Sequence, residues 1–110
     1  MEDNILIDEK YIHIDCEYDN KEDLLKYLTD TMLEDNVIKN TFYENILARE
    51  FKYPTGLNTG VIKVAIPHTN PEHVNEAAIS IATLKNPIKF NNMENSNEEL
   101  FIDLGFMLPV

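Results

Sequence analysis

One histidine lies where its ring is free to react. The segment Val64-Ala65-Ile66-Pro67-His68 places an imidazole directly after a proline that ends the β-branched run 61–66. Proline fixes its own backbone angle and does not continue a sheet ladder, so the ring is directed out of the core from a rigid position. A neutral imidazole has a free lone pair near neutral pH, and a phosphorylated imidazole transfers its phosphoryl group readily. His68 is therefore a candidate nucleophile, and the alternative is an ordinary loop histidine.

The other two histidines are weaker candidates. His13 lies in the first expected strand, where a structural or exposed role is expected, and His73 follows in a loop and is interpreted as a surface residue. His68 and His73 are five residues apart, a spacing that matches no usual zinc motif, and the single cysteine, Cys16, is distant in sequence. The sequence therefore predicts no metal site and no cofactor.

Two helices are expected before this strand. Asp19-Asn20-Lys21-Glu22 and Thr41-Phe42-Tyr43-Glu44 both have the form of a capping box, which satisfies free backbone N–H groups at a helix start. The first helix has an apolar stripe at three- and four-residue steps: Leu24, Leu25, Leu28, Met32 and Leu33. The second has a shorter stripe: Phe42, Ile46 and Leu47. It is expected to end near Glu50, with Arg49 in its last turn, where the helix dipole favours a cation.

The remaining apolar segments predict strands. They are residues 10–15, 61–66, 77–84, 87–90 and 100–108, and the last one has apolar residues at every second position from Leu100 to Leu108, expected on one face. Helices and strands joined by short connections predict an α/β fold, a mixed β-sheet flanked by helices, in a single domain over residues 1–110. Ligands of open α/β sheets tend to bind beyond the carboxyl ends of strands, which is where His68 lies.

Composition narrows the possible partners. Nine Lys and Arg residues against twenty Asp and Glu residues give a net charge of −11, which disfavours nucleic acid and anionic membrane surfaces as partners. Apolar runs are too short for direct membrane insertion. Cys16 has no second cysteine with which to form an internal disulfide, and the acidic residues 1–4 do not resemble a secretory signal. We therefore expect a cytoplasmic protein.

Three linked pieces of sequence resemble a known family. They are the pair Arg49-Glu50, the turn Thr55-Gly56-Leu57 and the strand end Val64-Ala65-Ile66-Pro67-His68-Thr69, followed by Pro87-Ile88-Lys89-Phe90. In this order they resemble the IIA phosphocarrier domain of the phosphoenolpyruvate-dependent sugar phosphotransferase system, in its fructose and mannitol superfamily. The threonine after the proline-histidine pair is similar to the galactitol-type branch. The resemblance covers about residues 5–108.

This resemblance implies a phosphate relay. The family's active histidine, matched here by His68, accepts a phosphoryl group from the histidine phosphocarrier protein and passes it to a cysteine of the IIB component. Arg49 matches the family's active-site arginine, whose guanidinium is able to donate two parallel hydrogen bonds to phosphoryl oxygens. The alternative for Arg49 is a helix-end cation paired with Glu50 or Glu44. Thr69 is a further candidate for binding the phosphoryl group, through its hydroxyl or its backbone N–H.

The turn before the strand is expected to position this site. Thr55-Gly56-Leu57 follow the helix stop at Tyr53-Pro54, and we expect them to bring Arg49 beside His68. Gly56 is expected to supply a backbone angle that other residues resist, which is a structural role.

The chain departs from the family pattern near its end. Leu104-Gly105-Phe106-Met107-Leu108 matches the strand after which family members carry a second active-site histidine, but the sequence stops at Val110. The expectation is a IIA fold truncated at the C-terminus, without the closing helices, that accepts phosphate slowly or not at all. If those helices cover one sheet face, that face is left apolar and exposed, which favours a homo-oligomer.

A second function class is also consistent with the sequence. IIA-like domains exist as regulatory or interaction modules, in which phosphorylation changes a contact instead of supporting sugar uptake. The sequences of the two classes overlap, so the residues alone do not separate a phosphotransferase component from a sensor. They also do not identify the sugar.

Overall fold

The computed structural model describes residues 5–109. The two bounds of the predicted domain, Met1 and Val110, therefore lie outside the described residues. The helices are α1 (Lys21–Glu34) and α2 (Phe42–Lys52), and two short 3₁₀ turns occur at Glu9–Tyr11 and Pro71–His73. The strands are β1 (Ile12–Cys16), β2 (Gly56–Asn58), β3 (Lys63–Ala65), β4 (Ser80–Asn91) and β5 (Glu99–Met107).

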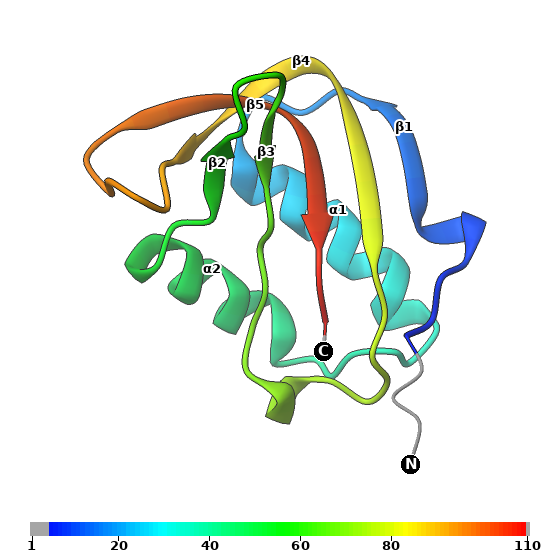
Figure 1. Cartoon of the computed structure of the whole chain (residues 1–110). Coiled ribbons are helices and arrows are strands. Elements are labelled where there is room, and N and C mark those ends of the chain that lie inside the picture. Colours follow the sequence, from blue (N-terminus) through cyan, green and yellow to red (C-terminus); the bar gives the residue numbers. More distant parts are fainter. Residues whose placement is uncertain (1–4, 110) are drawn as a thin grey trace.

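One five-stranded sheet organises these elements, in the order β1-β4-β5-β3-β2 (Figure 1). β1 runs parallel to β4, and β3 runs parallel to β5, whereas the β4–β5 and β2–β3 pairs are antiparallel. The predicted mixed sheet is therefore confirmed. β5 lies at its centre, beside the strand that leads to His68.

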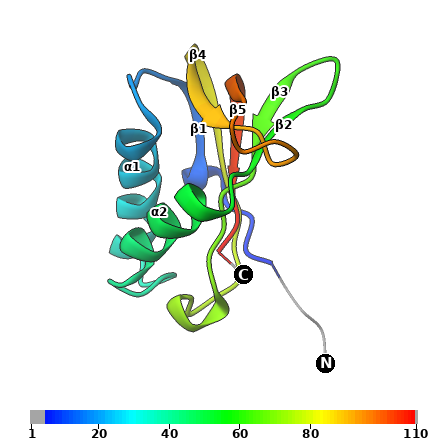
Figure 2. The same cartoon turned by 90° about the vertical axis from the view of Figure 1, so that its left-hand side faces the viewer.

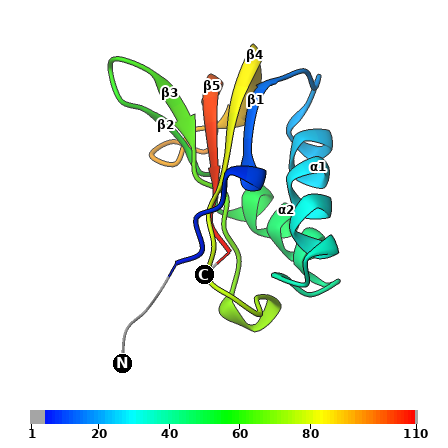
Figure 3. The same ribbon diagram turned by 90° about the vertical axis from the view of Figure 1, so that its right-hand side faces the viewer.

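Both helices pack on the same face of this sheet (Figures 2 and 3). Their apolar stripes meet the sheet in one core, whose largest fully buried side chains include Leu24, Leu28, Met32, Phe42, Ile46, Phe90 and Ile102. At the sheet end, the Thr29 hydroxyl of α1 donates a long hydrogen bond to Met107 Sδ at 4.0 Å, which places Met107 on the helix face. Within residues 5–109, no membrane-spanning helix is present, because neither helix is long and apolar enough.

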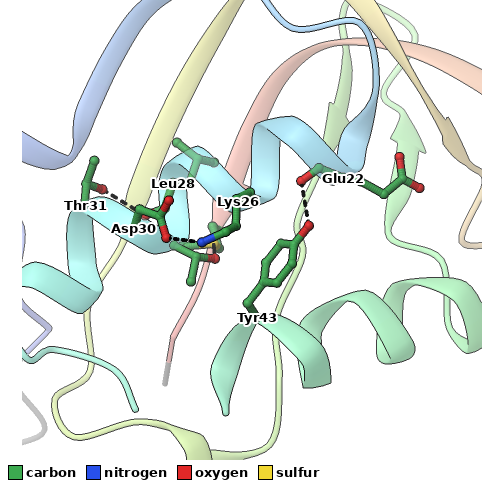
Figure 4. A network of polar contacts seen from close by, with 8 residues as sticks. Glu22, Lys26, Leu28, Asp30, Thr31 and Tyr43 are labelled. Carbon is green, nitrogen blue, oxygen red and sulfur yellow. Dashed lines mark hydrogen bonds and ion pairs between the residues drawn. The ribbon is translucent and has the colours of Figure 1, made fainter. Parts of the chain in front are cut away.

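The two helices also contact each other through polar groups at their crossing. The Tyr43 hydroxyl of α2 donates a hydrogen bond to the Glu22 carbonyl of α1 at 3.1 Å (Figure 4). On the exposed side of α1, Lys26 forms an ion pair with Asp30 at 2.6 Å, one helical turn later. Such an exposed pair contributes little to stability, so the apolar core carries the packing.

Both helix starts differ from the predicted capping boxes. Asn20, not Asp19, caps α1, because its side-chain oxygen accepts a hydrogen bond from the Asp23 backbone N–H at 2.8 Å. Thr41 precedes α2 but makes no capping hydrogen bond, since its hydroxyl pairs with His73 Nδ1 at 2.7 Å. The helices were therefore predicted correctly, but their caps were not. The prediction that Leu33 belongs to the apolar stripe was also wrong, because its side chain is 38% exposed.

Several strand boundaries differ from the sequence expectation. β3 begins only at Lys63, and Val61 is 95% exposed in the turn before it. The predicted segment 77–84 begins three residues before β4, and its remainder belongs, with segment 87–90, to this one strand, whose pairing with β5 is irregular between Thr83 and Ile88. Pro87 lies in that irregularity, which is where a strand tolerates a residue without an N–H. The short strand β2 was not expected.

β5 does not keep one face along its length, so that prediction was wrong. Leu100 and Ile102 are buried, but further along the buried positions are Gly105 and Met107, while Leu104 and Phe106 are only partly buried. The change occurs opposite the irregular part of β4, where β5 bends (Figure 1). A bulge of this kind re-aims the side chains that follow it.

The face opposite the helices is apolar and uncovered by any helix of the described chain (Figures 2 and 3). Cross-strand partners share a face, so Ile12, Ile81 and Phe106 form one row across β1, β4 and β5. A second row consists of Leu57, Val64, Leu104 and Thr83. We call these two rows the open face.

The structural constraint at Gly56 is not the unusual backbone angle that the sequence predicted. The described glycine with a positive φ is Gly60, at 89°, whereas Gly56 lies in β2 with no such angle. A Cβ on Gly56 would lie 2.6 Å from the Asn91 carbonyl oxygen, because the backbone of β4 passes directly over it. The constraint at Gly56 is therefore close backbone approach.

Gly56→Ala should lower the free energy of unfolding by about 1–3 kcal/mol, because the added methyl group forces two strands apart. Gly105→Ala is the matched control: a Cβ there meets nothing within 4 Å, so stability should be nearly unchanged. Urea unfolding of both variants, followed by circular dichroism, measures the difference. Equal stability of the two variants would contradict this reading of the contact.

Candidate functional site

The His68 ring is oriented by the backbone of its own strand end. β3 ends at Ala65, and His68 Nδ1 lies 2.9 Å from the Ile66 carbonyl oxygen. His68 is half-buried. A carbonyl oxygen only accepts hydrogen bonds, so Nδ1 carries the hydrogen of the neutral ring. The other nitrogen, Nε2, then keeps its lone pair. The segment is fixed further where the Leu108 N–H donates to the Pro67 carbonyl at 2.9 Å, beside a β-bridge between His68 and Leu108.

Arg49 reaches the loop that carries His68. It lies in the last full turn of α2, and its Nη1 donates a hydrogen bond to Asn70 Oδ1 at 2.9 Å, two residues after His68. The guanidinium lies over the Tyr53 ring, 5.6 Å from its centroid. Arg49 Nε is buried and has no hydrogen-bond partner. The structure thus brings Arg49 to the His68 loop through Asn70.

The alternative role of Arg49, an ion pair with Glu44 or Glu50, is not seen among the described residues. Neither carboxylate lies within ion-pair distance of its guanidinium. Consecutive helix residues point in different directions, so Glu50 faces the protein interior while Arg49 faces the loop. The guanidinium charge is therefore not neutralised by a carboxylate.

Thr69, directly after the candidate nucleophile, has an unsatisfied hydroxyl. The residue is 5% exposed, and its Oγ1 is buried without a hydrogen-bond partner. Leaving a buried hydroxyl unpaired costs about 1–3 kcal/mol, so such groups call for an explanation. The residue with this unpaired hydroxyl is the sequence neighbour of both His68 and Asn70, the residue that Arg49 contacts.

Glu50 was missed as a site residue by the sequence analysis. Its side chain is 2% exposed, and both carboxylate oxygens accept hydrogen bonds from Thr55, at 2.8 Å from the backbone N–H and 2.7 Å from the hydroxyl. Burial raises the pKa of Glu50, and the Thr55 hydrogen bonds and the nearby charges of Lys21 and His68 oppose that rise. Glu50 belongs to the Arg49-Glu50 pair, one of the three pieces of sequence that resemble the family, and this was the available indication of a role. Nothing in the sequence indicated that Glu50 is buried.

Two cations, Arg49 and Lys52, lie close together at the end of α2 although the whole chain carries −11. Arg49 and Lys52 both lie over the Tyr53 ring, at 5.6 and 5.4 Å from its centroid. A hollow of about 270 Å³ lies between these side chains and Asn70. A larger hollow, of about 610 Å³, lies between the start of α1 and strands β4 and β5, and neither His68 nor Arg49 lines it.

The other two histidines have partners of their own. His13 Nδ1 lies 3.1 Å from the Tyr27 hydroxyl, and burial lowers the pKa of His13. His73 pairs with Thr41, so it lies at the start of α2 and not in an exposed position free of contacts. Across residues 5–109, no three His, Cys, Asp or Glu side chains are grouped to hold a metal ion.

Comparison with known proteins identifies the family. Residues 5–109 match the family described as "Phosphoenolpyruvate-dependent sugar phosphotransferase system, EIIA 2". This chain belongs to that EIIA family. Within it, the galactitol-specific EIIA component of Escherichia coli K12 is 27% identical over 79 residues, which are 72% of this chain and 53% of that protein. The chain thus spans about half the length of this EIIA relative.

A second relative and a solved structure extend the comparison of this EIIA chain. The transcriptional regulator ManR of Bacillus subtilis is 27% identical over 99 residues, which are 90% of this chain and 14% of that protein. The fold matches enzyme IIAMTL, solved in complex with phosphorylated enzyme IIBMTL from Escherichia coli, with a TM-score of 0.74 and 15% identity. That alignment covers 94% of this chain and 70% of the solved one. The α/β fold expected for a IIA domain, with a five-stranded sheet and two helices, is confirmed.

Two threonine-to-valine substitutions should separate a structural from a site role in this EIIA chain. Thr55→Val removes a donor to the buried Glu50 carboxylate and should lower the free energy of unfolding by about 1–3 kcal/mol. Thr69→Val removes a hydroxyl that has no partner, so stability should change by less than about 0.5 kcal/mol or increase. Urea titrations of both variants test this contrast. A large loss of stability in Thr69→Val would mean that its hydroxyl is structurally bound.

Proposed function

We propose that this chain is a phosphocarrier that accepts a phosphoryl group on His68 and passes it on for sugar uptake. The donor is the histidine phosphocarrier protein, and the acceptor is a cysteine of the IIB component. The observation that carries the proposal is the hydrogen bond from His68 Nδ1 to the Ile66 carbonyl, at 2.9 Å, because it leaves Nε2 as the nucleophilic nitrogen. Membership of the EIIA family supports the same chemistry.

The transfer step needs positioning more than bond activation. The Nε2 lone pair forms a bond to phosphorus while the bond from phosphorus to the donor's ring nitrogen breaks, and that nitrogen keeps the electron pair. His68 retains its hydrogen on Nδ1, so the ring gains positive charge, and its hydrogen bond to Ile66 becomes charge-assisted. Charge in such a transition state is spread over the phosphoryl oxygens, so donors placed around them lower the barrier.

Arg49 and Thr69 are proposed as those donors. Arg49 Nε and Thr69 Oγ1 are both buried and without partners; Thr69 directly follows His68, and Arg49 contacts Asn70 of the same loop. Transfer of Arg49 Nη1 from Asn70 to a phosphoryl oxygen would replace a neutral acceptor by a negatively charged one, which strengthens the hydrogen bond. The substrate-binding role of Thr69 rests on the same unpaired hydroxyl.

The partners follow from the chemistry and from the relatives. A IIB component is supported as the acceptor, since the matching solved structure is a complex of enzyme IIAMTL with phosphorylated enzyme IIBMTL. Phosphorylated partners need cations around their own phosphoryl groups, and a net charge of −11 steers such partners toward this chain. We place the protein in the cytoplasm, where this relay operates, and in the galactitol-type branch on the strength of Thr69 and the galactitol-specific relative.

A regulatory module is the alternative. It is favoured by the similarity to the transcriptional regulator ManR, which extends over 99 residues of this chain. In that role His68 would be phosphorylated to alter a contact, and onward transfer to IIB would be absent. Transfer from the labelled chain to a IIB cysteine therefore distinguishes the two functions.

Incubation with phosphoenolpyruvate and the general relay proteins should place acid-labile, base-stable phosphate on His68. His68→Ala should remove it, whereas His73→Ala, a matched change in the same loop, should keep it. Arg49→Lys should slow acceptance by about 100-fold, because a single ammonium does not reproduce the guanidinium fork. Radiolabelled phosphoenolpyruvate and intact-mass spectrometry give both readouts. Label that persists in His68→Ala overturns the assignment of the acceptor.

We also propose that the open face pairs with a second copy of the chain. Ile12 is 41% exposed, and its row partners Ile81 and Phe106 are only partly buried, so the sheet presents contiguous apolar side chains to solvent. Contiguous apolar patches on soluble proteins mark association sites. Two copies that each carry −11 repel one another, so this association is opposed at low ionic strength.

Sedimentation equilibrium should show a dimer whose association strengthens as salt rises from about 0.02 to 0.5 M, because screening weakens the repulsion. Phe106→Lys places a charge in the centre of the open face and should abolish the dimer. Leu33→Lys, on the exposed side of α1, is the matched control and should leave it intact. A monomer at all salt and protein concentrations contradicts the proposal.

A further inference from the structure

A buried carboxylate is connected to the His68 ring through the backbone. Glu50 is 2% exposed, and it is the one Asp or Glu side chain buried to this extent in the described part of the chain. Both of its oxygens accept hydrogen bonds from the same residue, Thr55. Burying a carboxylate is costly unless it is hydrogen-bonded, and the Thr55 pair meets that requirement.

The hydrogen bonds continue from Thr55 to the nucleophile. The Thr55 carbonyl accepts a hydrogen bond from the Ile66 N–H at 3.3 Å, and the Ile66 carbonyl accepts one from His68 Nδ1 at 2.9 Å. Thr55 and Ile66 directly extend the antiparallel β2–β3 pair, in which Gly56 is paired with Ala65. The residue that orients the ring is thus held across the sheet by the residue that Glu50 holds.

We propose that Glu50 is a positioning residue for the phosphoryl acceptor, acting through Thr55 and Ile66 to keep the His68 ring with Nε2 free. This inference rests on the proposed phosphocarrier function. Glu50 fixes the end of the β2–β3 pair, and that pair fixes the carbonyl that binds Nδ1. Without the carboxylate, Thr55 loses two acceptors, and the Ile66 carbonyl is no longer held in place for the ring.

Charge supports the same role. Glu50 lies near enough to His68 for the two to interact electrostatically, and Lys21 of α1 is the other charged side chain that acts on it. The His68 ring becomes positive as Nε2 bonds to phosphorus, and a fixed carboxylate in a low-dielectric environment stabilises that charge. Glu50 touches neither the ring nor the phosphoryl group, so its effect is one of position and field.

The direct test is the hydrogen on the His68 ring, measured in the unphosphorylated protein by ¹⁵N NMR and assigned with His68→Gln. In the wild-type chain Nδ1 should carry the hydrogen. In Glu50→Ala the ring should populate both tautomers, and phosphoryl acceptance should slow by about 10- to 100-fold, as expected for a misplaced reacting group. Glu50→Gln should restore the wild-type ring signal, because its amide is able to accept from the Thr55 N–H and donate to the hydroxyl.

Glu44→Gln, an equivalent change at an exposed position of α2, is the control and should alter neither readout. If folded Glu50→Ala retains the wild-type ring signal and rate, the inference is overturned. If Glu50→Ala does not fold, Thr55→Val is measured instead, and an unchanged ring signal there also overturns it. The ring measurement needs no phosphoryl donor, so a wild-type chain that accepts no phosphate contradicts the proposed function while the positioning test is still decided.

Discussion

The hydrogen bond between His68 Nδ1 and the Ile66 carbonyl is the interaction on which the proposed phosphoryl acceptance depends. It exists because β3 ends at Ala65, so the next carbonyl is not used by the sheet, and because Pro67 directs the chain to bring the ring back over it. The partner of the ring is a backbone carbonyl, so its position does not depend on the rotamer of a second side chain. The orientation of the ring therefore depends on the position of Ile66, which is held by its hydrogen bond to Thr55 at the end of the β2–β3 pair.

Two neighbouring residues of α2, Arg49 and Glu50, contact the His68 loop and the start of β2, respectively. An ion pair between them would satisfy both charges and leave the site without a cation. Adjacent positions on a helix diverge, so Arg49 reaches Asn70 in the loop, while Glu50 enters the core and binds Thr55. The carboxylate of Glu50 is satisfied by Thr55, whereas Arg49 Nε and the Thr69 hydroxyl are buried and have no hydrogen-bond partner. Two of the buried, unpartnered polar atoms among residues 5–109 thus belong to this loop and to the helix residue that contacts it.

Sequence patterns located the elements well and their boundaries poorly, for physical reasons that particular residues make clear. The apolar stripe of α1 and the strand before His68 are local features, so they were predicted. Asn20 and Asp19 are both good caps, and only the geometry of the first turn selects Asn20.

Long-range contacts explain the other differences. Pro87 suggested a break between strands, but the long β4 accommodates it in an irregular segment whose register is set by β5. The role of Gly56 depends on Asn91, which is distant in sequence. The role of Glu50 was not predicted because most acidic residues on helices are exposed, and the sequence alone does not show that this one is buried.

The central strand β5 links the open face to the site. Leu104 and Phe106 belong to the open face, and Leu108, two residues later, donates the hydrogen bond that holds the Pro67 carbonyl beside His68. The opposite side of the same strand presents Met107 to α1. Interiors packed at this density transmit displacement, so a partner seated on Leu104 and Phe106 contacts the strand that fixes the His68 backbone. The open face and the backbone support of His68 therefore share one strand, so the proposed dimer and the proposed phosphoryl acceptor are linked through β5.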